Sequence, residues 1–428
     1  MKALVYLGSR SSNEKLILIS LIAFLNALVF IFIFQYRQPL DFDGHEYDAI
    51  GWNFAQGAGL IFEGQPYVVK PPTYHIFVGI IYFLFGHHPI IILLVQAILY
   101  GITCALIYFI AKKYFDEPSS LLASLLLAIY FPLANYASGV LPEVVAVLLS
   151  VLIVLFWIRY VQQNQRLDLF LCGLILGLII LCKPALFFLP LVIIVQFILQ
   201  GAGIRRILFA SGILFLGVAI PLSFWVQRNF STFGEFILLS KGNMGSVVVR
   251  SVIDEDYRYG LWNDVHNWHN QNSQDPRLTL KREVERRIEL ASARNPSKSK
   301  DRLYLEETWR LIQDDPVTYV SGAFVRIFRL WIGHPTSSSF ATKYFVAGFD
   351  AGVLMLAVIG GVANRSRWRE LSVFWLPIVY ITLIHLPMHV EPRYAAPMRP
   401  FLLIFSALGV MAISGWVRLR LQARLLSI

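Results

Sequence analysis

The chain has 428 residues, of which 57% are hydrophobic and only 15% are charged, and its mean hydropathy is +0.60. A soluble domain contains roughly 45–50% apolar and about 25% charged residues, so one soluble core cannot bury this excess of apolar side chains. The net charge of +10 comes from basic residues that are spread along the chain, which argues against nucleic-acid binding. The composition therefore predicts an all-α integral membrane protein.

A helix needs about 20 predominantly apolar residues to span a bilayer. By this criterion we expect about ten transmembrane helices, several of them close to the short limit. In chain order, the predicted spans are residues 16–35, 90–111, 119–135, 143–159, 167–181, 185–199, 207–226, 345–363, 371–386 and 400–417.

Basic residues in short loops predict the orientation, because Lys and Arg are enriched on the cytoplasmic side of a membrane. Two shorter apolar stretches, 74–85 and 317–333, are expected to be interfacial or re-entrant helices on the outer side. If neither stretch crosses and the amino terminus is inside, every basic loop lies inside as well. These loops are residues 112–113, 159–166, 205–206 and 365–369, together with the basic residues after 417.

The same orientation divides the chain into three expected parts. Residues 1–227 form an amino-terminal transmembrane module, which includes a first outer loop at 36–89 that we expect to be catalytic. Residues 228–343 form a second outer loop with juxtamembrane helices and a small helical part, and residues 344–428 form the last transmembrane helices. The sequence assigns no role to the polar middle of the second loop.

An acidic cluster with a histidine follows the first predicted span directly. Residues 41–48 contain four carboxylates, those of Asp41, Asp43, Glu46 and Asp48, together with His45 and Tyr47. A solvated acidic loop is one interpretation, but charges beside a membrane are costly unless they form part of a site. In a site, a carboxylate would act as a general base on a hydroxyl or hold a divalent cation.

Four cations from distant parts of the chain are predicted to lie on the same outer face. Each alone can be an anchor at a helix end. Together they resemble a binding site for a phosphate or pyrophosphate. They are Lys70, which precedes two prolines, Lys183, Arg228, and Arg393, which stands between Glu391 and Tyr394. Glu143 begins the fourth span at the same face, either as a favourable charge at a helix amino terminus or as part of the site.

Taken in order, these motifs resemble the GT-C superfamily of membrane glycosyltransferases that use polyprenyl-phosphate sugars. The likeness is to the group of protein O-mannosyltransferases and lipid A aminoarabinose transferases, glycosyltransferase family 39-like. The motifs that carry it are Asp43-Gly-His-Glu-Tyr47, Gly57-Ala-Gly59, Lys70-Pro-Pro-Thr-Tyr74, Pro132 with Glu143, Arg228-Asn229, and Arg393-Tyr-Ala-Ala-Pro397.

The resemblance implies a role for each site residue. Asp43 would be the catalytic base, with Asp41 as the alternative, and three cations would bind the donor phosphate, namely Lys70, Arg228 and Arg393. The remaining residues of the substrate cavity would be Glu143, Tyr47, His45, Lys183, Tyr394 and Glu391.

The resemblance also implies the partners of the protein. The donor would be a polyprenyl-phosphate sugar and the acceptor a lipid, glycan or protein, in contact with membrane lipids. No cofactor is required for this reaction, although a divalent cation remains possible. The expected location is the bacterial inner (plasma) membrane, with the active site on the outer face.

Two other functions compete with the enzyme. A transporter or flippase of a polyprenyl-linked or other anionic substrate should carry polar residues in the middle of its spans. In this sequence the charged residues gather at the ends of the apolar segments, which favours a site at the interface. A membrane scaffold would leave the outer acidic and basic residues unexplained.

Overall fold

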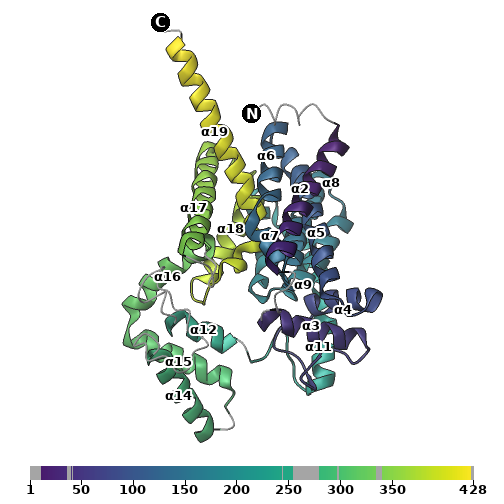
Figure 1. The fold of residues 1–428 in the computed structure, drawn as a ribbon, viewed down its shortest axis with the longest axis vertical. Helices are drawn as coiled ribbons and strands as arrows, with labels where there is room; N and C mark the ends of the chain where they lie inside the picture. Colours follow the sequence, from purple (N-terminus) through teal and green to yellow (C-terminus); the bar gives the residue numbers. More distant parts are fainter. Residues whose placement is uncertain are drawn as a thin grey trace.

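The structure is a computed structural model, and it describes residues 11–35, 40, 42–242, 244–253, 279–295, 298–333 and 340–425. Figure 1 shows a bundle of long helices with several shorter helices gathered at one end. The start of α2 and the end of α19 lie at the opposite end of the bundle. The expected all-α membrane class is confirmed.

All ten predicted spans are helical in the structure. Their bounds are α2 (Ser12–Phe30) with the π-helical turn η1 (Ile31–Gln35), α5 (Pro89–Lys112), α6 (Glu117–Ala128) with α7 (Phe131–Ala137), α8 (Glu143–Gln163), α9 (Arg166–Ile180), η2 (Pro184–Leu186) with α10 (Leu189–Leu199), α11 (Ile204–Phe233), α17 (Phe340–Ala363), α18 (Ser372–His385), which follows the short turn η4 (Arg365–Arg367), and α19 (Arg399–Leu425). Six helices within the described residues are long and apolar enough to cross a membrane alone, or seven if α6 and α7, bent by 48°, form one span.

The helices α9, α10 and α18 are shorter than a full span, and for α9 the contacts at its two ends show how far it reaches. At one end of α9, Asp168 pairs with Arg159 at 3.2 Å. Just beyond its other end, Lys183 pairs with Glu143 at 2.6 Å. Because Arg159 and Glu143 lie near opposite ends of α8, α9 and the turn after it extend as far as α8 does.

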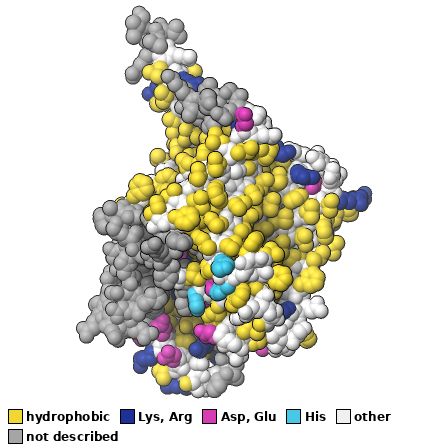
Figure 2. Space-filling model, turned by 45° about the vertical axis from the view of Figure 1, so that its right-hand side comes forward, with side chains coloured by type: hydrophobic (Ala, Val, Ile, Leu, Met, Phe, Trp, Pro, Cys, Tyr) yellow, Lys and Arg dark blue, Asp and Glu magenta, His cyan; other side chains and the backbone are white. Residues whose placement is uncertain are grey.

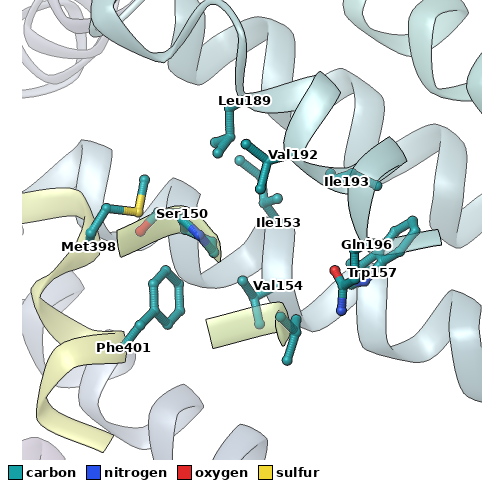
Figure 3. A pocket seen from close by; sticks show the side chains of 12 residues that line it. Ser150, Ile153, Val154, Trp157, Leu189, Val192, Ile193, Gln196, Met398 and Phe401 are labelled. Atoms are coloured by element: carbon teal, nitrogen blue, oxygen red, sulfur yellow. The ribbon is translucent and has the colours of Figure 1, made fainter. Parts of the chain in front are cut away.

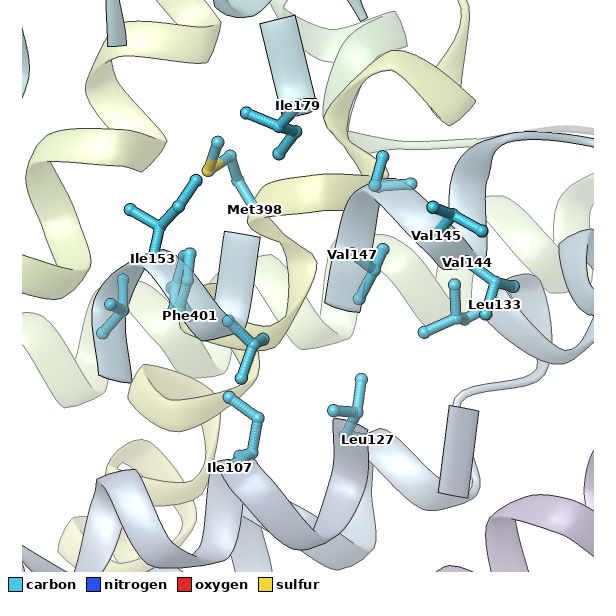
Figure 4. Close-up of a cluster of buried hydrophobic side chains, with 14 of the residues drawn as sticks. Ile107, Leu127, Leu133, Val144, Val145, Val147, Ile153, Ile179, Met398 and Phe401 are labelled. Carbon is cyan, nitrogen blue, oxygen red and sulfur yellow. The ribbon is translucent and has the colours of Figure 1, made fainter. Parts of the chain in front are cut away.

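The bundle is held together by apolar packing and by close approach of backbones. Figure 4 shows part of the core, to which α5, α6, α8 and α19 contribute Ile107, Leu127, Val147 and Phe401. A Cβ atom at Gly173 of α9 would collide with the carbonyl oxygen of Leu214 in α11, so the contact between these helices requires glycine.

The outer surface of the bundle is itself apolar. Figure 2 shows a broad hydrophobic surface across the middle of the visible face, with most charged side chains above and below it. Several spans expose large apolar side chains on the outside of the bundle, among them Ile17, Ile98, Leu216 and Met355. A surface of this kind is suited to lipid and not to water.

The shorter elements gather at the end where the acidic cluster lies (Figure 1). They are α3 (Phe42–Ala55), the antiparallel hairpin β1 (Ile61–Phe62) and β2 (Gln65–Pro66), α4 (Thr73–Phe85), α12 (Met244–Ile253), α14 (Thr279–Arg294), α15 (Lys300–Asp314), α16 (Pro316–Trp331) and the 3₁₀ segment η5 (Pro392–Met398). The two apolar stretches that were expected not to cross are α4 and α16, with 13 and 16 residues.

Helix α16 has two different faces. Its apolar residues Val317 and Phe324 are exposed. Arg326 on the other face is buried and donates hydrogen bonds to the carbonyl oxygens of Leu386 and Ser251 at 2.6 and 2.8 Å. Arg326 therefore joins α12 and the end of α18 to α16. The interfacial position of α16 stays a prediction.

Candidate active site

The carboxylate of Asp43 lies between two cations from distant parts of the chain. Asp43 stands in the first turn of α3. Lys70 Nζ lies 2.9 Å from its Oδ1, and an Nη atom of Arg393 lies 2.8 Å from its Oδ2. The side chains of Asp43, Lys70 and Arg393 remain 26%, 20% and 23% exposed, so a substrate can reach all three.

Lys70 is fixed by its surroundings. The two prolines after it lead directly into α4, and Thr73 at the start of α4 binds α9 through a hydrogen bond from its Oγ1 to the carbonyl oxygen of Leu178 at 2.9 Å. The ammonium group lies 4.8 Å from the centre of the Tyr47 ring, a favourable cation–π distance.

A second carboxylate, Glu46, belongs to the predicted acidic cluster but was given no role of its own from the sequence. Its Oε1 lies 2.8 Å from Lys70 Nζ and also accepts a hydrogen bond from the Tyr67 hydroxyl. Sequence reasoning treated residues 41–48 as an outer loop. In a helix, positions i and i+3 face the same side, so Glu46 joins Asp43 on one face of α3.

Arg393 is oriented by a neighbour in its own segment. Its Nε donates to Glu391 Oε2 at 2.7 Å, and His389 Nε2 lies 3.4 Å from the other oxygen of Glu391. Glu391 therefore holds one edge of the guanidinium while the other edge faces Asp43. The cluster as a whole contains three carboxylates and two cations. Lys70 pairs with Asp43 and Glu46, and Arg393 pairs with Asp43 and Glu391.

Electrostatics keep the Asp43 carboxyl ionised. Burial alone would raise its pKa, but the positive charges of Arg393 and Lys70 outweigh burial and lower the pKa below its ordinary value. At neutral pH the carboxylate can accept a proton, although its ion pairs keep it a weak base. Any anion that takes Lys70 and Arg393 as its partners would make Asp43 more basic.

Glu143 and Lys183 form a deeper ion pair, with 2.6 Å between Oε1 and Nζ. Glu143 is fully buried at the start of α8, and its Oε2 has no hydrogen-bond partner among the described residues. Burial, followed by the charges of Glu143 and Asp43, raises the pKa of the buried Tyr47. The Tyr47 ring, which contacts the Lys70 ammonium, therefore lies in the electric field of both carboxylates.

Arg228 was expected to bind the donor phosphate together with Lys70 and Arg393. In the structure its partners include backbone carbonyl groups. Its guanidinium donates to the carbonyl oxygens of Tyr67 at 2.8 Å and Leu60 at 3.1 Å. It also lies 5.2 Å from the ring centre of Trp225. These contacts hold the β1–β2 hairpin against α11, and none of them is to Asp43. A role of Arg228 in phosphate binding stays a prediction.

The other predicted residues differ in their placement. His45 is exposed, with its ring 6.5 Å from that of Phe62. Tyr394 stacks on His385, with 5.5 Å between the ring centres. Asp41 lies outside the described residues.

A buried charged pair at the edge of the site was not predicted. Arg399 at the start of α19 lies 3.6 Å from Asp350 of α17 and donates to the carbonyl oxygen of Trp331 at 2.7 Å. Asp350 also accepts hydrogen bonds from the Tyr130 hydroxyl at 2.6 Å and from the Gly333 backbone at 2.9 Å. This network joins the end of α16 to the bundle. The pair of Asp350 and Arg399 therefore has a structural role.

Two further features bear on the chemistry. Among the described residues, no three His, Cys, Asp or Glu side chains converge as metal ligands, and the divalent-cation alternative stays a prediction. Figure 3 shows a pocket lined mainly by apolar side chains such as Ile153, Leu189 and Phe401. Its volume is about 20 Å³. Such a volume holds roughly one water molecule and no sugar.

Comparison with protein families shows one match. Residues 69–226 match the family model described as dolichyl-phosphate-mannose-protein mannosyltransferase. The matched stretch contains Lys70, Glu143 and Lys183. No curated protein sequence matches the chain.

Comparison with solved structures shows several similar chains. The apo oligosaccharyltransferase of Archaeoglobus fulgidus superposes with a TM-score of 0.59 at 14% identity, covering 97% of this chain and 52% of that one. AglB of the same organism, in complex with an inhibitory peptide and a dolichol-phosphate, gives 0.57 at 14% identity, with 96% and 52% covered. ArnT of Cupriavidus metallidurans bound to undecaprenyl phosphate gives 0.43 at 14% identity, with 93% and 77% covered.

The chain therefore shares its fold with the archaeal oligosaccharyltransferase over nearly its whole length, at low sequence identity. Over residues 69–226, the match to the model for dolichyl-phosphate-mannose-protein mannosyltransferases agrees with the resemblance that the motifs indicated. The chain spans about half the length of the archaeal oligosaccharyltransferase, which leaves the activity, substrates and partners of the protein to be proposed from its own site.

Proposed function

We propose that the protein is a membrane glycosyltransferase that moves a sugar from a polyprenyl-phosphate donor to an acceptor hydroxyl on the outer face of the membrane. The observation that carries this proposal is the Asp43 carboxylate, held between Lys70 Nζ at 2.9 Å and Arg393 at 2.8 Å. One group in this arrangement accepts a proton, and the other two bind an anion. The reaction requires both.

The proposed step breaks the bond between the sugar C1 and the phosphate oxygen and forms a bond between C1 and the acceptor oxygen. The acceptor proton passes to Asp43, and the bonding electrons leave with the polyprenyl phosphate. Lys70 and Arg393 neutralise the charge that develops on the leaving phosphate. As they turn toward the phosphate, their hold on Asp43 weakens and its basicity rises.

The remaining contacts fit the same reaction. Glu46 and Glu391 keep Lys70 and Arg393 in place before the donor arrives, because each carboxylate lies within 2.8 Å of one of these cations. Arg228 supports the hairpin that leads to Lys70 by binding the carbonyl oxygens of Tyr67 and Leu60. The buried pair of Glu143 and Lys183 is proposed to line the sugar or acceptor side of the cavity.

A donor that carries a lipid phosphate agrees with one similar structure, since the archaeal AglB complex contains a dolichol-phosphate. The orientation with the site outside rests on the basic loops at the other end of the bundle. Sugar and acceptor are left open, because no residue of the site distinguishes among them.

The test is turnover of purified protein with a panel of polyprenyl-phosphate sugars. We expect release of polyprenyl phosphate by the wild type and a loss of about 10²–10⁴-fold in Asp43→Asn, which removes the proton acceptor. Glu63→Gln is a matched control, because Glu63 is an exposed carboxylate in the hairpin turn near the site. Equal turnover in Asp43→Asn and Glu63→Gln would contradict the role of Asp43.

A further inference from the structure

A pocket lies at the end of the bundle opposite to Asp43. Helix α8 runs for 21 residues from Glu143 to Gln163, which corresponds to roughly 30 Å. There the chain turns sharply at Asn164, whose φ of 54° is left-handed, and continues as α9. Helix α11 begins beside this turn, since Arg206 in its first turn lies 3.4 Å from Asn164 Oδ1.

The pocket has a volume of about 450 Å³ and is open to the surface. It is lined by Tyr160, Asn164, Arg166, Arg206 and Phe209. The Arg166 guanidinium lies 5.1 Å from the centre of the Phe209 ring, and that of Arg206 lies 6.0 Å from the centre of the Tyr160 ring. The aromatic rings thus hold both cations, and Arg206 uses one N–H group for Asn164 Oδ1, which leaves its other N–H groups and those of Arg166 to face the pocket.

The charge in this pocket is unbalanced. None of the described residues that line it is acidic. The nearby carboxylate of Asp168 is 2% exposed and pairs with Arg159 at 3.2 Å. The amino terminus of α11 adds the positive end of its helix dipole. Two planar guanidinium groups in a pocket with net positive charge are well suited to bind phosphate oxygens.

The surroundings of the pocket distinguish a lipid phosphate from a free one. Leu167, Ile204 and Leu208 flank it and are 63%, 66% and 65% exposed, and Phe209 in its wall is 52% exposed. A dissolved phosphate ion gains nothing from these side chains, whereas acyl chains would cover them. Basic pockets between membrane helices are suited to anionic lipid headgroups.

We propose that the pocket formed by Arg166, Arg206 and Asn164 binds the headgroup phosphate of an anionic phospholipid, in the leaflet opposite to the Asp43 site. The lipid would hold the α8–α9 turn against the start of α11. This site is separate from the proposed donor site, so its loss should not remove the groups that perform the chemistry.

The test is native mass spectrometry of the full-length protein with phosphatidylglycerol and, for comparison, phosphatidylcholine. In Arg166→Gln/Arg206→Gln we expect phosphatidylglycerol to bind about tenfold or more weakly than in the wild type, because two charge-assisted contacts are lost. The control is Arg365→Gln/Arg369→Gln, two exposed arginines beside the start of α18 that do not line the pocket.

Three outcomes would overturn the proposal: unchanged phosphatidylglycerol affinity in the Arg166/Arg206 variant, an equal loss in the control, or displacement of the lipid by millimolar inorganic phosphate. The last outcome would indicate a site for a free anion. If the double variant fails to fold, the single Arg206→Gln and the charge-retaining Arg166→Lys/Arg206→Lys give the same comparison. We expect the lysine variant to bind more weakly than the wild type and more tightly than Arg206→Gln.

Discussion

Replacement of Lys70 by alanine tests whether this residue binds the donor phosphate or only anchors the chain. Its ammonium lies 2.9 Å from Asp43 and 2.8 Å from Glu46 and is 20% exposed. A charge-assisted contact to phosphate contributes about 1.5–3 kcal/mol, which corresponds to a factor of roughly 10–150 in affinity. Lys70 must leave two carboxylates to reach the phosphate, so we expect an effect at the lower end of this range. Lys70→Ala should bind polyprenyl phosphate about tenfold more weakly than the wild type.

The assay is equilibrium binding of polyprenyl phosphate to purified variants. Lys70→Arg should restore only part of the affinity, since a planar fork does not replace a compact ammonium. Adding Arg393→Ala should cost less than the sum of the two single losses, because both cations act on one phosphate. Lys241→Ala is the control, because Lys241 is exposed near the site but pairs with Glu235. Unchanged affinity in Lys70→Ala, with only the protein yield reduced, would refute the reasoning.

Three further predictions concern pH dependence, stability and orientation. Arg393 and Lys70 lower the pKa of Asp43 in the folded protein, so the two ion pairs stabilise the fold at a pH above the pKa of Asp43 in the unfolded chain. This stabilisation is lost as the pH falls through the pKa of Asp43 in the folded protein. Lys70→Ala should raise the folded-state pKa and move the acidic limb of kcat/KM to higher pH. Glu143→Gln leaves Lys183 without its charge partner and should destabilise the protein by up to about 3–5 kcal/mol in detergent unfolding, whereas retained stability would mean that Lys183 finds other partners. A cysteine at exposed Ser299 should react with an impermeant thiol reagent in intact cells and one at Gln163 should not, against a low background because the native cysteines are buried; the reverse pattern would move the site to the cytoplasm.

Most of the architecture follows from the sequence, because lipid requires long apolar helices with charges at their ends. The predicted segments 167–181 and 371–386 are the helices α9 and α18, within a few residues at each end. The motif order also placed Asp43, Lys70 and Arg393 on one face, and the structure brings these three side chains into contact.

The partners of individual side chains were harder to predict. Arg228 was expected to face a phosphate, but its position at the end of α11 puts two backbone carbonyl groups within its reach. Glu46 was counted in the acidic cluster but given no role, because its alignment with Asp43 depends on α3 being a helix. The pair of Asp350 and Arg399 joins residues from two separate helices, and no pattern in either segment predicts their contact.

The most direct test of the proposed reaction is ³¹P nuclear magnetic resonance of a polyprenyl-phosphate sugar incubated with the purified protein and an acceptor hydroxyl compound. The donor is a phosphodiester and the released polyprenyl phosphate is a monoester, so the two resonances separate substrate from product. We expect conversion to the monoester by the wild type, in equal amount to the glycosylated acceptor, and conversion at least about 10²-fold slower in Asp43→Asn. A phosphodiester that stays intact while the lipid moves across a reconstituted bilayer would contradict the transferase and support a flippase.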